Sequence, residues 1–195
     1  DADRICLYLH ATGLDHEEGA ADKGAYDFEK KENGFWSVTV EGDLNGVYYS
    51  YVVIRGEEKV ECIDPYAKAC GANGRRGMVL DMESTNPKGF DKDAAWYQKN
   101  KNTAIYELHV KDFSYDEHSG VSEEHRGKYL AFTEQNTTLD NNGKVKTGVA
   151  YLKDLGITHV HLLPSYDFGS IDEIGDNKQF NWGYDPVNFN VPEGS

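Results

Sequence analysis

Short apolar runs separated by polar turns in the first part of the chain, up to about residue 80, predict β-structure. Arg4–His10 is a short apolar strand candidate, and the polar, glycine-containing stretch Gly13–Lys31 is expected to be a loop. Trp36, Val38 and Val40 occupy one face of a further expected strand, because side chains two residues apart point to the same side of a strand.

The next positions continue this pattern with turn signals between short apolar runs. Asn45-Gly46 is a strong hairpin signal, so Tyr48–Ile54 is predicted to fold back on the strand before it. Lys59–Ile63 is expected to pair once more, and Met78–Leu80 to form a last short strand. Several short strands joined by turns favour an antiparallel, immunoglobulin-like β-sandwich.

The pattern changes after the proline- and glycine-containing stretch Asn86–Phe90. We therefore expect two domains, a β-sandwich over residues 1–88 and an α/β portion over residues 89–195. The second portion starts with a predicted strand, Ala104–Val110. A long loop over residues 112–143 follows, and loops of that length tend to be functional or mobile.

A helix and a strand are predicted after this loop. Val145, Val149, Leu152 and Leu155 are apolar at helical spacing, which predicts a helix over Lys144–Leu155. Gly156 lies where a helix C-cap glycine belongs. Ile157–Leu163 is the following strand, so strand, loop, helix and strand form one parallel βαβ unit.

Composition narrows the classes of function. The 195 residues are 38% hydrophobic and 12% aromatic, enough for a packed core, and 34 acidic against 20 basic residues give a net charge of −14. This balance argues against nucleic acid and anionic membranes as partners. An acidic surface is compatible with an uncharged polymer as the partner, although the acidity can equally serve only to keep the protein soluble. No apolar run approaches the ~20 residues of a membrane span.

The three cysteines are an odd set without metal-ligand spacing, and we interpret them as ordinary thiols. Localisation stays open between the bacterial cytoplasm and secretion.

Several motifs stand out in the second portion. They are Ile105-Tyr106-Glu107-Leu108-His109-Val110-Lys111-Asp112-Phe113-Ser114, Gly127-Lys128-Tyr129-Leu130-Ala131-Phe132-Thr133, Leu155-Gly156-Ile157-Thr158-His159-Val160-His161-Leu162-Leu163-Pro164, Asp167-Phe168-Gly169-Ser170 and Phe180-Asn181-Trp182-Gly183-Tyr184-Asp185-Pro186. These motifs resemble type I pullulanases, which belong to glycoside hydrolase family 13, the α-amylase superfamily. The last motif is similar to the signature YNWGYDP, with Phe180 in place of the usual tyrosine.

Three further motifs lie upstream: Gly34-Phe35-Trp36-Ser37-Val38, Gly42-Asp43-Leu44 and Asp64-Pro65-Tyr66-Ala67. They resemble the family-48 carbohydrate-binding module that precedes the catalytic barrel of these enzymes. The resemblance implies an N-terminally clipped module followed by the first units of a catalytic (β/α)8 TIM barrel. A complete barrel needs about 250 residues, far more than the second portion offers.

The resemblance implies a debranching enzyme that hydrolyses α-1,6-glucosidic bonds by a retaining mechanism. Its expected partners are α-glucans (pullulan, starch and glycogen-type branched glucans) and the remainder of the barrel. The retaining mechanism needs two carboxylates ~5–5.5 Å apart, and by resemblance neither lies in this chain. We therefore expect no catalytic residue here and no activity from this chain alone.

The resemblance places four substrate-binding residues in the signature. Tyr184 would stack on the sugar and stabilise the developing cationic charge with its ring face. Asp185 would fix that sugar or the groups around it. Asn181 and Trp182 would either contact the glucan or shape the loop. Without the resemblance, Gly183 and Pro186 would mark an ordinary turn.

Two further groups carry side chains that can bind metals. His159 and His161 share one strand face, but no third ligand is evident, and a zinc site needs three or four protein ligands or ligand positions. The acidic stretch Ser170–Asp176 has carboxylates that suit calcium, although a solvated acidic loop explains it as well. We expect no cofactor, with calcium as the one open alternative.

The aromatic residues of the first portion have two interpretations. Trp36 with Tyr48, Tyr49 and Tyr51 would make a sugar-stacking platform or simply fill a core, and the parity of Trp36 with Val38 favours the core.

The function of the whole protein also has alternatives. It would alternatively be an isoamylase or branching-enzyme relative, and a non-catalytic glucan-binding or structural module is the hypothesis of a different class.

Overall fold

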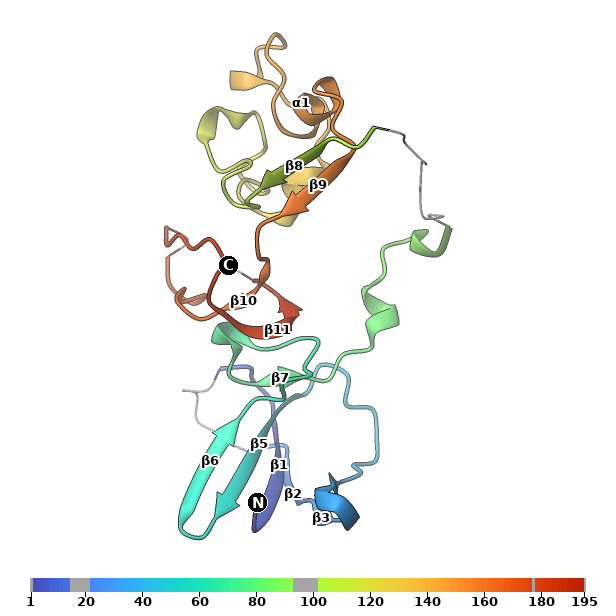
Figure 1. Cartoon of the computed structure of the whole chain (residues 1–195), viewed down its shortest axis with the longest axis vertical. Helices are drawn as coiled ribbons and strands as arrows, with labels where there is room; N and C mark the ends of the chain where they lie inside the picture. Colours follow the sequence, from blue (N-terminus) through green and yellow to red (C-terminus); the bar gives the residue numbers. More distant parts are fainter. Residues whose placement is uncertain (1, 15–21, 93–101, 177, 195) are drawn as a thin grey trace. The chain divides into compact units, whose positions relative to one another are not determined.

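A computed structural model describes residues 2–14, 22–92, 102–176 and 178–194 (Figure 1). Contacts divide the chain into two compact units, one made of Asp1–Phe90 with Tyr166–Ser195 and the other of Asp91–Ser165. This grouping differs from the expected domains, 1–88 and 89–195, because the last stretch of the chain joins the first unit. The expected division by sequence stays a prediction.

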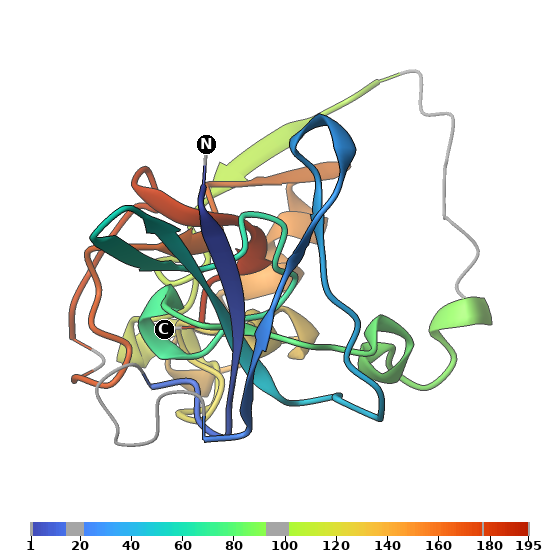
Figure 2. The ribbon, with the colours of Figure 1, turned by 90° about the horizontal axis from the view of Figure 1, so that it is seen from below.

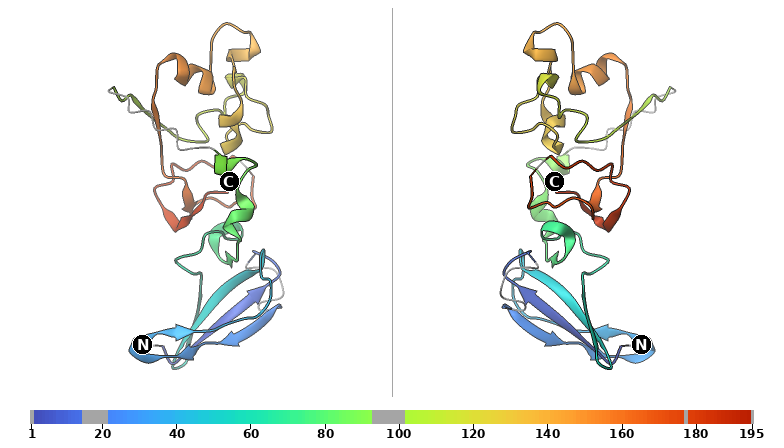
Figure 3. Two further views of the ribbon diagram at one scale, coloured as in Figure 1. Left: turned by 90° about the vertical axis from the view of Figure 1, so that its right-hand side faces the viewer. Right: turned by 90° about the vertical axis from the view of Figure 1, so that its left-hand side faces the viewer.

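The first unit contains a five-stranded antiparallel sheet (Figures 1 and 3). Its central strands are paired along their length, with Leu7 opposite Tyr51 and Leu9 opposite Tyr49. Figure 2 shows the same strands from below, with the strand Arg4–His10 in dark blue. The strands are, in spatial order, β2 (Gly24–Asp27), β1 (Arg4–His10), β5 (Tyr48–Arg55) and β6 (Glu58–Cys62), with β7 (Gly77–Met78) also on β5.

The strand predictions for β1, β5 and β6 are confirmed, and the loop prediction for Gly13–Lys31 is wrong in part. Within that stretch, β2 pairs with β1, and β3 (Glu29–Lys30) pairs with β4 (Trp36–Ser37). These short strands contain Gly, Asp, Glu and Lys, residues depleted in strands. Pairing with a neighbouring strand, rather than intrinsic propensity, places them in sheets.

The predicted hairpin between the Trp36 strand and β5 is wrong. Asn45-Gly46 does form a tight turn, in which the Val47 amide donates to the Leu44 carbonyl at 2.9 Å. The Gly46 amide then donates to the Val79 carbonyl at 2.8 Å. Because β1 lies on one edge of β5 and β6 and β7 on the other, no edge is left for β4.

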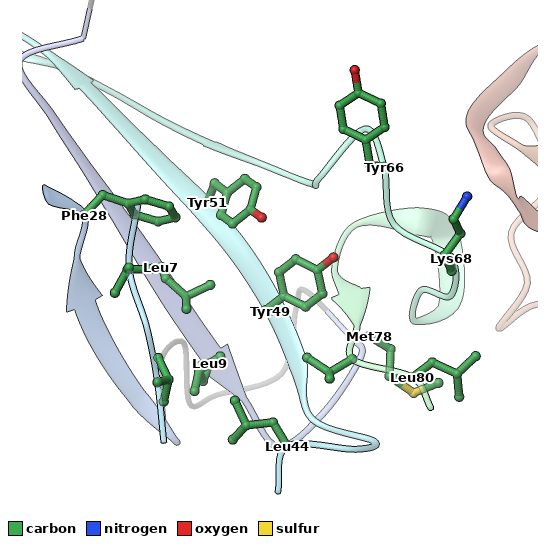
Figure 4. A pocket seen from close by; sticks show the side chains of 13 residues that line it. Leu7, Leu9, Phe28, Leu44, Tyr49, Tyr51, Tyr66, Lys68, Met78 and Leu80 are labelled. Carbon is green, nitrogen blue, oxygen red and sulfur yellow. The ribbon is translucent and has the colours of Figure 1, made fainter. Parts of the chain in front are cut away.

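One face of the sheet borders an apolar hollow of about 420 Å³ (Figure 4). Leu7 and Leu9 of β1 and Tyr49 of β5 face it from the sheet. Val38 and Val40 line it as well, so they share a face as expected although no strand continues there. The described residues thus show a β-rich unit, while the immunoglobulin-like sandwich stays a prediction.

The last stretch of the first unit is a hairpin of β10 (Tyr166–Phe168) and β11 (Pro186–Pro192), which pair antiparallel. Phe168 and Val191 are buried. Asp167 and Asn188 are buried polar partners, with the Asn188 amide nitrogen 2.6 Å from the Asp167 carboxylate.

The second unit holds β8 (Ile105–Leu108), α1 (Gly148–Asp154) and β9 (His159–Leu162). The strands are parallel, with Ile105 opposite His159, which confirms the predicted strand, helix and strand order. Gly156 adopts φ +70°, and the amides of Gly156 and Ile157 donate to the carbonyls of Lys153 and Leu152. This is the Schellman arrangement, and it confirms the predicted C-cap glycine.

The helix is shorter than predicted because residues 144–147 do not join it. The Leu139 amide donates to the Val145 carbonyl, and the Thr147 amide to the Thr137 carbonyl. Backbone pairing with residues 137–139 therefore competes with the first helical turn. A closed barrel is beyond what the described residues show.

Short 3-10 helices complete the fold, and none of the described helices is long and apolar enough to cross a membrane. The three cysteines are free thiols, as expected. In the loop over residues 112–143, Phe113 stacks on Phe132 with ring centroids 4.7 Å apart. The 3-10 helices are η1 (Glu32–Gly34), η2 (Ala72–Gly74), η3 (Met82–Thr85), η4 (Phe90–Lys92), η5 (Glu117–Ser119), η6 (Tyr129–Thr133) and η7 (Leu139–Asn141).

Candidate functional site

Three aromatic side chains project into solvent from the connection between β10 and β11. Phe180, Trp182 and Tyr184 are 50%, 59% and 67% exposed. Phe180 and Trp182 meet edge to face with ring centroids 6.3 Å apart. We call residues 180–185 the aromatic loop. Large exposed rings cost solubility, so a cluster of three on one loop is typical of a binding surface.

Polar side chains brace the base of this loop. Asn181 Nδ2 donates to Asp185 Oδ1 at 2.7 Å and to Ser170 Oγ at 2.6 Å. Ser170 Oγ donates to Asp185 Oδ2. Asn181 Oδ1 accepts from the Gly183 amide at 2.7 Å, and the Asp185 carbonyl accepts from the Gly169 amide at 3.2 Å. Both ends of the aromatic loop are therefore tied to the end of β10.

Asp185 is an ionised group in this setting. The hydrogen bonds from Ser170 and then Asn181 lower its pKa, so the carboxylate form prevails at neutral pH. Each carboxylate oxygen accepts one of these hydrogen bonds. A carboxylate has about four acceptor positions, so Asp185 retains capacity for hydroxyl donors of a ligand.

The four predicted binding residues therefore lie together, in two kinds of position. Trp182 and Tyr184 present rings to solvent, whereas Asn181 and Asp185 form the brace. With Ser170 and Phe180 they line one open depression. Sequence reasoning missed the role of Ser170, which it treated as the end of one motif and the start of an acidic stretch. No signal in the sequence places position 170 beside position 185.

The acidic stretch Ser170–Asp176 makes hydrogen bonds both within itself and with Asn73. Asp172 Oδ1 accepts from Asn73 Nδ2 at 3.1 Å and from the Ile174 amide at 3.2 Å. Burial raises the pKa of Glu173. Across the described parts of the chain, no three His, Cys, Asp or Glu side chains gather in a way that would hold a metal ion. The expectation of no cofactor, with calcium as the open alternative, stays a prediction.

The two strand histidines each have a local partner. His161 Nδ1 lies 3.0 Å from a Glu107 carboxylate oxygen, and His159 Nδ1 lies 2.8 Å from the Thr158 hydroxyl. The pair thus has a structural explanation without a metal.

Tyr49 and Tyr51 of β5 line the apolar hollow shown in Figure 4, whereas Tyr48 does not. Asp64 Oδ2 accepts from the Tyr49 hydroxyl at 2.9 Å and from the Tyr51 hydroxyl at 3.4 Å. Burial, with Asp64 beside it, raises the pKa of Tyr51 to about 12. Trp36 is half-buried, with Lys30 Nζ 5.3 Å from its ring centroid. For Tyr49 and Tyr51 this arrangement favours core packing.

Comparisons with known proteins match this chain to a carbohydrate-binding module and to pullulanases. Residues 12–67 match the family Carbohydrate-binding module 48 (Isoamylase N-terminal domain). The pullulanase of Bacillus subtilis (strain 168) is 41% identical over 174 residues, which cover 87% of this chain. The chain is related to the pullulanases over most of its length.

Solved structures of pullulanases have the same fold over nearly the whole of this pullulanase-related chain. The pullulanase from Bacillus acidopullulyticus matches with a TM-score of 0.88 and 41% identity over 99% of the chain. The pullulanase from Paenibacillus barengoltzii, solved in complex with maltohexaose and α-cyclodextrin, matches with a TM-score of 0.86 and 40% identity over 98% of the chain. The chain spans 23% of the Bacillus subtilis and 23% of the Bacillus acidopullulyticus protein, and 29% of the Paenibacillus barengoltzii one.

Proposed function

We propose that this chain is part of a debranching enzyme that hydrolyses α-1,6-glucosidic bonds of starch or pullulan with retention. Its own contribution is to bind the α-glucan through the aromatic loop. The observation that carries the proposal is the exposure of Trp182 and Tyr184 above the brace of Asn181, Asp185 and Ser170. The relation to pullulanases, one of them solved with maltohexaose, supports the choice of ligand.

The chemistry of the aromatic loop suits a sugar. A glucose ring has apolar C–H faces and hydroxyl edges. The rings of Trp182 and Tyr184 offer flat apolar surface for the faces, and Asp185 offers carboxylate oxygens for the hydroxyls. In the intact enzyme, the electron-rich face of Tyr184 would also stabilise the positive charge of the oxocarbenium-like transition state.

We further propose that residues 1–88 are a carbohydrate-binding-module sandwich and that residues 89–195 begin a (β/α)8 barrel. Exposure of the parallel pair β8 and β9 supports the barrel. Ile105 is 65% exposed, and Val160 and Leu162 are exposed as well. Parallel strands are normally covered on both faces. The exposed apolar residues of β8 and β9 are therefore those expected of strands that are buried in a barrel wall.

A titration with maltohexaose tests the binding proposal. Trp182→Ala and Tyr184→Ala should each weaken binding by roughly 2- to 12-fold, because an aromatic contact contributes about 0.5–1.5 kcal/mol. Isothermal titration calorimetry measures the affinity. Phe90→Ala is the matched control, because Phe90 is 56% exposed but lies outside both the aromatic loop and the family match over residues 12–67. Unchanged affinity in both loop variants would refute the assignment.

A second candidate function follows from the family match over residues 12–67, which is described as an isoamylase N-terminal domain. The parent protein would then be an isoamylase or branching-enzyme relative, and the module would serve as a glucan-binding or structural element. Retention of maltohexaose binding after both loop substitutions, with loss on substitution in the module, would favour this second function.

A further inference from the structure

Asn73 in η2 forms a clasp with two residues that lie 99 and 100 positions later in the first unit. Its Nδ2 donates to Asp172 Oδ1 at 3.1 Å, and its Oδ1 accepts from the Glu173 amide at 2.9 Å. Its own amide donates to a Glu173 carboxylate oxygen. The side chain and the backbone amide of Asn73 thus bind the carboxylates of Asp172 and Glu173 and the backbone amide of Glu173.

The surroundings of Asn73 fit this clasp closely. Asn73 has φ +60°, a left-handed conformation that Asn tolerates better than most residues. Next to it, the Gly74 carbonyl accepts from Asn188 Nδ2 at 3.1 Å. A Cβ atom at Gly74 would lie 2.3 Å from a carboxylate oxygen of Asp167. Only a residue without a side chain allows η2 to approach β10 and β11 this closely.

The clasp connects directly to the aromatic loop. The Asp172 amide donates to Gln179 Oε1 at 2.9 Å, and residue 179 precedes the aromatic loop. On the other side of Asp172, Ser170 donates to Asp185 at the end of that loop. The segment held by Asn73 is therefore linked to both ends of the aromatic loop.

We propose that Asn73 is a positioning residue for the aromatic loop. It sets the positions of Trp182 and Tyr184 for the glucan, although it lies in the part of the chain that precedes β7 and its hydrogen bonds go to Asp172 and Glu173. The inference rests on the proposed function for its ligand. The clasp itself rests on the hydrogen bonds alone, so the two can fail separately.

The first test compares Asn73→Gly with Asn33→Gly. Asn33 is a matched control because it has the same side chain and nearly the same backbone conformation, φ 58° and ψ 25° against φ 60° and ψ 17°. Glycine accepts both conformations, so each variant loses only the side chain. Asn33 lies in η1, outside the clasp.

Amide hydrogen exchange of the whole chain reads the clasp without any sugar. Asn73→Gly should speed exchange at residues 171–176 by about 10-fold, because side-chain hydrogen bonds to charged groups are lost. Asn33→Gly should leave these amides unchanged. Maltohexaose affinity should fall by roughly 5- to 10-fold in Asn73→Gly alone, with the urea unfolding midpoint of the β-sheet retained.

A rescue experiment separates a specific clasp from a general structural role. Asn73→Asp places a second carboxylate opposite Asp172 and should loosen the segment as Asn73→Gly does. Adding Asp172→Asn exchanges the two side chains and reverses the direction of their hydrogen bond. The double variant should recover exchange rates and affinity to within about 3-fold of the native chain.

The outcomes discriminate clearly. Equal exchange at residues 171–176 in the two glycine variants, or a double variant no better than Asn73→Asp, would overturn the role of Asn73. Trp182→Ala is measured in parallel. If it leaves affinity unchanged while Asn73→Gly speeds exchange, the glucan assignment fails and the clasp stands.

Discussion

Asp167 and Asp27 are aspartates of the same unit whose surroundings shift the pKa in opposite directions. Burial raises the pKa of Asp167, against the opposing hydrogen bond from Asn188. At Asp27, hydrogen bonds from Arg4 and then Cys6 lower the pKa of an exposed carboxylate. Folding therefore favours the protonated form of Asp167 and the ionised form of Asp27.

This contrast predicts opposite pH dependence. Because the folded pKa of Asp167 is raised, its stabilising contribution is present at low pH and is lost as pH rises from about 3.8 through the raised value. Asp167→Asn keeps an acceptor oxygen but cannot ionise. The free energy of unfolding of this variant, relative to that of the native chain, should increase across that window and then level off.

Asp27→Asn is the control of opposite sign. Its lowered pKa means that the native contribution is present above 3.8 and is lost as pH falls through the lowered value. Asp27→Asn should therefore be the less stable form at neutral pH and match the native chain in acid. Urea unfolding from pH 3 to pH 7 measures both differences. Parallel curves for the two variants would contradict the assignment of these shifts.

Among the elements, β5 and β9 differ in how their edges and faces are covered. β5 lies between β1 on one edge and β6 and β7 on the other, and its Ser50 and Val52 are fully buried. Among the described strands, β9 pairs only with β8, and its four residues are exposed. Backbone protection is therefore expected to be unequal.

We expect amides of β5 to exchange at least ~100-fold more slowly than those of β9, because opening β5 requires disruption of a whole sheet. Hydrogen exchange followed by mass spectrometry measures both strands in one sample. β6 serves as the internal control, because it is an exposed edge strand of the well-formed sheet. Protection of β9 equal to that of β5 would show that β9 is covered in solution.

The elements also show how far the sequence predicts this structure. The apolar run in Arg4–His10 and the β-branched and aromatic run in Tyr48–Arg55 predict their strands, because both patterns are local. The pairing of these two strands with one another is non-local, and a hairpin signal at Asn45-Gly46 pointed to a different partner. In the site, the motif located Trp182 and Tyr184, but the brace through Ser170 and the clasp through Asn73 depend on distant contacts that no local pattern encodes.

At the scale of the whole molecule, we predict that this chain alone releases no reducing sugar from pullulan. Asp185 is the carboxylate in the depression of the aromatic loop, and its lowered pKa leaves it unprotonated at neutral pH. A general acid needs the opposite shift, and a retaining mechanism needs a second carboxylate beside it.

A reducing-sugar assay tests this, with the Bacillus subtilis pullulanase as the positive control. Activity that co-purifies with the chain and disappears in Asp185→Asn would contradict the prediction. Activity that persists in that variant would indicate a catalytic pair elsewhere in the chain, which would equally refute it.

The clasp between Asn73 and Glu173 joins positions 100 residues apart, and the second unit, Asp91–Ser165, is encoded between them. During synthesis, the ribosome therefore delivers the complete second unit before the residues that finish the first. At about 5–20 residues per second, this delay is on the order of 10 s. The length of the intervening loop adds little to the free-energy cost of forming the clasp, since each doubling of loop length costs only about 0.6 kcal/mol. For that interval the nascent chain presents η2 without β10 and β11, so the clasp forms only after the whole second unit has been synthesised.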